Sequence, residues 1–211
     1  MTTESTSCVK KSRGRPKVFD REAALDKAMT LFWQHGYEAT SLSDLVEATG
    51  AKAPTLYAEF TNKEGLFRAV LDRYIARFAA KHEAQLFCEE KSVEAALGDY
   101  FTAVATCFTS KDTPAGCFMI NTSATLAAAS RDIAHTVKSR HAMQEQTLTQ
   151  FLRQRQERGE IPAHCNVQNL AEYLSCILQG MSISAREGAS FDKLMQITHT
   201  TLRLWPELLK V

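Results

Sequence analysis

The sequence contains few residues that interrupt helices and few signs of β-structure. Glycine (9) and proline (5) are scarce among its 211 residues. Strict alternation of apolar and polar residues, the pattern of a half-buried strand, is also rare. Apolar residues instead recur every three or four positions along nearly the whole chain, which is typical of amphipathic helices. We therefore expect an all-α protein of about nine helices.

Long apolar segments are absent as well. The longest stretch without a charged residue, 113–130, contains Pro114, Gly116 and Asn121 and is a poor candidate for a membrane span. The N-terminal sequence MTTESTSCVKKSRGRPK has no apolar segment of the kind that directs secretion. We expect a cytoplasmic protein that does not enter the membrane.

The cysteines lack the spacing of a metal or disulfide framework. No C-x-x-C pair occurs among the six, which stand at positions 8, 88, 107, 117, 165 and 176. This excludes a zinc ribbon and a small secreted disulfide scaffold, and we expect reduced thiols. The chain also lacks G-x-S-x-G, H-E-x-x-H, P-loop and G-x-G-x-x-G motifs, so we predict no catalytic residues, no metal site and no cofactor. An all-helical small-molecule-binding or thiol-redox enzyme without DNA binding remains the alternative.

Charge is balanced overall but not locally. The chain has 25 basic and 24 acidic residues, and residues 72–211 contain fifteen of each. The N-terminus, in contrast, places five cations within eight residues that include no acid: Lys10, Lys11, Arg13, Arg15 and Lys17. Nucleic-acid contacts are therefore expected at the N-terminal end, and the remainder is unlikely to hold DNA.

Three short helical patterns follow the basic segment. An apolar stripe over residues 20–34 predicts a helix that stops near Gly36, and S-x-x-D at Ser41 predicts the start of a second helix ending at Gly50. A third helix is expected at about 53–59. The last two have the length and turn of a helix-turn-helix, whose second helix enters the DNA major groove, although spacing alone also fits a solvated helical hairpin. The exposed candidates for DNA contact are Lys52, Thr55, Tyr57 and Lys63.

The remaining apolar stripes predict six longer helices. The first starts at Thr61 or Asn62 and connects the N-terminal unit to the rest of the chain. The others cover about 93–108, 117–126, 131–158, 167–181 and 191–205, the last ended by Pro206.

Three short motifs follow one another between Phe19 and about Tyr74: G-Y-x-x-T-S at 36–41, D-L-x-x-x-x-G at 44–50 and T-L-Y-x-x-F-x-x-K-E-x-L at 55–66. With these motifs, the segment resembles the DNA-binding domain of TetR-type transcriptional regulators. By position, the resemblance implies DNA contacts at Thr55, Tyr57 and Lys63. The chain departs from residues frequent in the family at Ala53, Ala58 and Glu59. DNA binding is thus implied, but no particular operator sequence.

The resemblance also implies that three segments of the chain have different functions. Residues 1–18 would form a basic arm, 19–65 the helix-turn-helix domain, and 66–211 a domain that binds an effector and dimerises. Such a protein would be a homodimer on a double-stranded DNA operator, most often a repressor, with a small-molecule effector whose identity the sequence does not reveal. Apolar residues that could meet the second copy are Leu178, Met181, Leu202 and Trp205, although the same stripes could simply close the core of one protomer.

An effector pocket is expected between the longer helices. Aromatic, soft and polar residues mix there, at Phe101, Phe108, Cys117, Met119, Asn121, Met143 and Tyr173. Because pockets are mostly apolar, each of these residues could equally be a core residue. Cys107 and Cys117 flank a Pro-Ala-Gly turn and could approach each other to sense oxidants, although buried thiols are usually inert.

The basic arm contains Arg-Gly-Arg-Pro, which resembles the core of an AT-hook. Arg13 and Arg15, held extended around Gly14, would fit a narrow A·T-rich minor groove. Eight extended residues reach roughly 25 Å, enough to leave the first helix and enter the groove beside the recognition helix. The alternative is a tail that only promotes solubility.

Overall fold

The computed structural model describes residues 19–125 and 131–210, and all regular secondary structure in these two ranges is helical. The predicted all-α class is therefore confirmed. The elements are α1 (Arg21–Ala39), α2 (Leu42–Thr49), α3 (Ala53–Phe60), α4 (Lys63–Tyr74), the π-helical turn η1 (Ile75–Ala79), α5 (Ala80–Leu86), α6 (Val93–Phe108), α7 (Phe118–Thr125), α8 (Arg131–Glu157), α9 (Val167–Arg186), α10 (Phe191–Arg203) and α11 (Trp205–Leu208).

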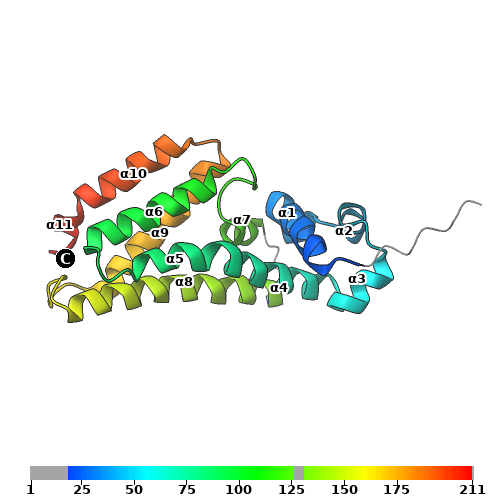
Figure 1. The fold of residues 1–211 in the computed structure, drawn as a ribbon, viewed down its shortest axis with the longest axis horizontal. Helices are drawn as coiled ribbons and strands as arrows, with labels where there is room; N and C mark the ends of the chain where they lie inside the picture. Colours follow the sequence, from blue (N-terminus) through cyan, green and yellow to red (C-terminus); the bar gives the residue numbers. More distant parts are fainter. Residues whose placement is uncertain (1–18, 126–130, 211) are drawn as a thin grey trace, which may run out of the picture.

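The helices form an elongated molecule (Figure 1). Helices α1, α2 and α3 lie at one end, and α10 and α11 reach the other. The continuous segment α4–η1–α5 runs along the long axis between them, next to the long helix α8. No helix in the described ranges is both long enough and apolar enough to cross a membrane.

Local signals fix the ends of the N-terminal helices. Ser41 and Asp44 form the predicted capping box of α2, and Gly50 ends this helix with a left-handed backbone (φ 67°). Asn62 caps α4 by accepting a hydrogen bond from the N–H of Gly65. Gly65 itself is required by close packing, because a Cβ there would lie 2.0 Å from the carbonyl oxygen of Phe60. These contacts fix the angle between α3 and α4.

Two helix boundaries differ from the sequence prediction. Helix α10 ends at Arg203, and Pro206 lies in the first turn of α11 instead of ending the preceding helix. Proline is compatible with a first helical turn, because the N–H that it lacks has no helical partner there. The predicted connecting helix is interrupted by the π-helical turn η1, where the hydrogen-bond register changes.

One hydrophobic core extends from α1 to α10. Where the N-terminal helices meet the rest of the chain, the indole of Trp33 contacts Tyr74, Phe78 and Phe118, with ring centroids 5.2 to 6.0 Å apart. Edge-on aromatic contacts of this kind favour a defined mutual orientation of the rings. The α1–α3 unit is therefore packed firmly onto α4, η1 and α7.

Candidate nucleic-acid interface and ligand pockets

Helix α3 presents one apolar and one exposed side. Leu56 and Phe60 are buried, as predicted, and hold α3 against α1, α2 and α4. Tyr57 keeps 43% of its surface exposed despite being a large aromatic residue. Lys52 is exposed at the N-cap of α3, and Thr55 is half-buried in its first turn. The structure thus brings three of the predicted DNA-contact residues together on one short helix.

Lys63, the fourth predicted contact, begins α4 beside the end of α3. Its Nζ lies 4.4 Å from the centre of the Tyr37 ring, a cation–π contact. Partial burial lowers the pKa of Lys63 from its ordinary value. The ring fixes the position of this ammonium group, so the cation is preorganised next to α3.

A carboxylate on α3 is neutralised by an ion pair. Glu59 accepts a hydrogen bond from Nε of Arg21 at 2.7 Å. The guanidinium of Arg21 also lies 5.3 Å from the centre of the Phe60 ring. Glu59 would otherwise place an unpaired negative charge on the helix expected to approach DNA phosphates.

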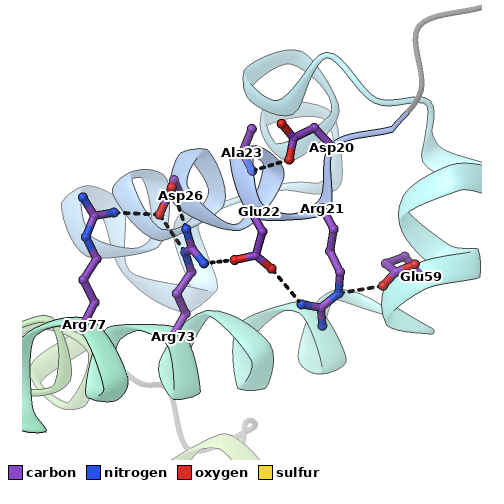
Figure 2. A network of polar contacts seen from close by, with 8 residues as sticks. All are labelled: Asp20, Arg21, Glu22, Ala23, Asp26, Glu59, Arg73 and Arg77. Atoms are coloured by element: carbon purple, nitrogen blue, oxygen red, sulfur yellow. Dashed lines mark hydrogen bonds and ion pairs between the residues drawn. The ribbon is translucent and has the colours of Figure 1, made fainter.

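The pair continues into a chain of ionic contacts that sequence reasoning missed. Figure 2 shows the residues involved, which come from α3, α1, α4 and η1: Glu59, Arg21, Glu22, Arg73, Asp26 and Arg77. Arg73 donates two hydrogen bonds to Asp26, at 2.7 and 2.8 Å, and a third to Glu22. Arg77 donates one to Asp26 at 2.9 Å. The bonds from Arg73 hold the pKa of the Asp26 carboxyl below its usual value.

One pocket lies where η1 and α5 face α6 and the loop after it. It has a volume of about 700 Å³, within the range of small-molecule sites. Its wall consists of Arg77, Phe78, His82, Ala103, Thr106, Cys107, Thr109, Ser110, Asp112, Thr113 and Phe191. None of these eleven residues belongs to the predicted effector set.

The predicted effector residues are distributed differently. Met119 and Met143 line a smaller cavity of about 220 Å³ between η1, α7 and α8. Tyr173 is half-buried on α9. The other four are buried in helix packing: Phe101, Phe108, Cys117 and Asn121.

Of the two cysteines considered for oxidant sensing, Cys117 is buried and Cys107 is half-buried. Burial raises the pKa of the Cys107 thiol to about 11, and it also raises the pKa of Cys117. The thiol of Cys117 lies 3.3 Å from the hydroxyl of Tyr74. Thiols react as thiolates, so both sites disfavour oxidation. Within the described ranges, no three His, Cys, Asp or Glu side chains lie close enough together to hold a metal ion.

Most of the residues expected at the dimer contact are buried inside the protomer. Leu178, Met181 and Trp205 are at most 2% exposed, whereas Leu202 is half-buried. The strongest apolar stripe of α9 therefore faces its own core, which was the alternative to an interface role for these residues. Arg13 and Arg15 lie outside the described residues.

Comparison with known proteins identifies both halves of the chain. The family model described as bacterial regulatory proteins of the tetR family matches residues 24–70. A second model, described as a tetracyclin repressor-like C-terminal domain, matches residues 94–198.

Individual relatives cover the full length. The chain is 82% identical to the HTH-type transcriptional repressor ComR of Escherichia coli (strain K12) over 100% of both chains. It is 30% identical to the HTH-type transcriptional repressor BdcR of the same organism over 86% of each. A cysteine mutant of the TetR family transcriptional regulator CifR, solved with a 26-base-pair double-strand operator, superposes with a TM-score of 0.86 at 29% identity, covering 91% of this chain and 100% of that one.

Proposed function

Because the chain belongs to the TetR family of bacterial regulatory proteins, we propose that it represses transcription as a homodimer on an inverted-repeat operator and is released by a small-molecule ligand. The family consists of DNA-binding regulators, so the enzyme alternative is set aside. A regulator that binds the bacterial chromosome acts in the cytoplasm.

The exposed side of α3 carries this proposal. Tyr57 and Thr55 of this eight-residue helix offer hydroxyl groups. Lys52 at its N-cap and Lys63 at the start of α4 offer ammonium groups. Hydroxyl and ammonium donors are suited to phosphate oxygens, which position a protein on the duplex. Because Ala53 and Ala58 are small, the backbone of α3 can approach the floor of the major groove closely.

The homodimer would form through α9 and α10. These helices expose or half-expose a second set of apolar residues beside the buried stripe: Tyr173, Ile177, Ile183, Met195 and Leu202. A Cβ at Gly180 would meet no atom within 4 Å, so the surface of α9 leaves room for another helix. Identical patches of this kind pair across a two-fold axis, which gives four helices at the contact and two α3 helices on one side of the dimer.

The basic arm extends the proposed DNA contact. Arg13 and Arg15 would enter the minor groove beside each half-site, where a narrow A·T-rich groove concentrates negative potential. The proposal rests on the Arg-Gly-Arg-Pro sequence and on its position directly before α1.

In vitro selection tests the proposal. The full-length protein would be used to select duplexes from a random DNA library, and the selected sites would be footprinted and titrated at several salt concentrations. We expect an inverted repeat whose half-site centres lie about 34 to 36 Å apart, and an affinity that falls with salt. Equal affinity for all duplexes, or protection of one unrepeated half-site, would overturn the proposal.

A further inference from the structure

The pocket beside η1 contains a cationic group with unused hydrogen-bond donors. Among the described residues that line it, Arg77 is the only lysine or arginine. Its side chain is 53% exposed, and it uses only Nη1 to bind Asp26. Within the described chain, no hydrogen-bond acceptor is assigned to its Nε or Nη2. Two N–H donors in the fixed geometry of a guanidinium therefore remain for a ligand, and this geometry matches a carboxylate.

The rest of the wall defines what such a ligand would look like. Phe78 and Phe191 supply aromatic surface, and Thr113 has a buried Oγ1 with no hydrogen-bond partner in the described chain. Burial lowers the pKa of His82, which disfavours its charged form. The wall contains one arginine, Arg77, and one acidic residue, Asp112. It can therefore pair with one carboxylate but offers no second lysine or arginine to a dianion.

We propose that this pocket is the effector site, that it takes a small organic monocarboxylate through Nε and Nη2 of Arg77, and that the bound carboxylate weakens the ion pair between Arg77 and Asp26. The regulatory role of the ligand rests on the proposed function, whereas the binding of a carboxylate is inferred from the pocket alone. Arg77 and Phe78 both belong to η1, and single π-helical turns are frequent at functional sites.

The ion-pair chain gives the ligand a route to the recognition helix. Asp26 of α1 is shared between Arg77 and Arg73, and Arg73 continues through Glu22 and Arg21 to Glu59 on α3 (Figure 2). A carboxylate on Nε and Nη2 shares the positive charge of Arg77 with Asp26, so each carboxylate weakens the binding of the other to the guanidinium. This coupling is reciprocal.

Calorimetric titration of the full-length protein tests the site without DNA. The probes are five sodium carboxylates that fit the pocket volume (acetate, butyrate, hexanoate, benzoate and 3-phenylpropionate), each paired with its primary amide. We expect at least one acid to bind about tenfold or more tightly than its amide, and Arg77→Gln to remove this preference. Arg158→Gln is the matched control, because Arg158 is also an exposed arginine with one carboxylate partner, Glu89.

Two results would overturn the site: no acid binds more tightly than its amide, or the preference survives Arg77→Gln. Asp26→Asn tests the competition, because no carboxylate at position 26 would then compete with the ligand for Arg77. We expect the acid to bind this variant at least about threefold more tightly, and unchanged affinity would refute the competition between the ligand and Asp26 for Arg77.

The selected operator then separates the inference from the proposed function. The bound acid should weaken operator binding by the wild type and leave the Arg77→Gln variant unaffected. An acid that binds without weakening operator affinity would refute its role as effector. Failure to select any operator would instead overturn the proposed function, while the calorimetric titration would still show whether Arg77 binds a carboxylate.

Discussion

Gly65→Ala is the substitution for which the structure predicts the clearest effect. The new Cβ would lie 2.0 Å from the carbonyl oxygen of Phe60 and 3.2 Å from its carbonyl carbon. A nonbonded carbon does not approach a backbone oxygen to 2.0 Å. Because the obstructing atoms are backbone, no rotamer change relieves the overlap, and α3 must move away from α4 by about 1.4 Å to restore ordinary contact.

This displacement has a cost that can be estimated. It disturbs the bond from the Gly65 N–H to Asn62, a helix cap worth about 1 kcal/mol, and it loosens the packing of the buried residues Phe60 and Leu66. Alanine recovers about 1 kcal/mol through its better helix propensity. We expect a net loss of about 2 to 4 kcal/mol in the free energy of unfolding, together with weaker operator binding, because Lys63 and α3 no longer keep their relative positions.

Gly98→Ala is the matched control within α6. A Cβ at Gly98 would meet only the Leu202 side chain, at 3.4 Å, so the same substitution should be neutral or raise stability by up to about 1 kcal/mol. Denaturant unfolding followed by circular dichroism, at one fixed protein concentration, compares the variants. If Gly65→Ala unfolds at the same denaturant concentration as the wild type and binds the operator equally well, the steric reasoning is wrong.

Four further predictions concern the DNA contacts, the dimer and acid stability. Tyr57→Phe combined with Lys63→Ala should weaken binding to all duplexes and lower the salt slope by about one in a mobility-shift titration. Deletion of residues 1–17 should reduce affinity chiefly for operators with A·T-rich flanks, and equal losses on G·C flanks at the same salt concentration would refute the minor-groove assignment. Ile183→Asp, on the exposed side of α9, should shift sedimentation toward the monomer, and an unchanged dimer would contradict the proposed contact. Because the Asp26 pKa is lowered in the folded state, its stabilising contribution is present above about pH 4 and lost as pH falls through the lowered value, so Asp26→Asn should flatten the acid side of the unfolding profile.

The helix-turn-helix was largely predictable because its signals are local. The capping box at Ser41, the left-handed Gly50 and the cap at Asn62 each act within four residues, so sequence spacing determines them. The inward side chains Leu56 and Phe60 follow from helical periodicity. These features place α3 and its exposed residues before any tertiary contact is known.

The dimer residues were harder to assign from the same periodicity. A helix that contacts both its own core and a partner has two apolar stripes, and the stronger one faces the core. Leu178 and Met181 belong to that stripe and are buried, whereas Ile177 and Ile183 lie on the weaker one. Hydrophobicity alone ranks the stripes by strength and does not say which one is left uncovered.

The pocket proposed as the effector site could not be singled out from composition. Packing residues and lining residues are of the same types, so Phe101 and Phe108 fit either role by sequence and are in fact packed. The ionic chain, in contrast, left a signal. Glu22 and Asp26 are four residues apart on one helix, as are Arg73 and Arg77 on another segment, so two helical faces of opposite charge were available to pair once the helices were known to be neighbours.

The segment α4–η1–α5 connects the proposed ligand site and the proposed DNA site through a single continuous piece of chain. Its first residue, Lys63, is fixed against Tyr37 of α1, and Arg77 in its π-helical turn reaches both the pocket and Asp26. Phe78 joins the same turn to Trp33 of α1 through an edge-on contact at 5.7 Å. A movement of η1 would therefore be transmitted to α1 through one polar and one aromatic contact. Helix α1 is in turn the helix against which α2 and α4 are packed. Coupling between the sites requires no ligand contact with α3, because the element that the ligand touches is also the element that orients the α1–α3 unit.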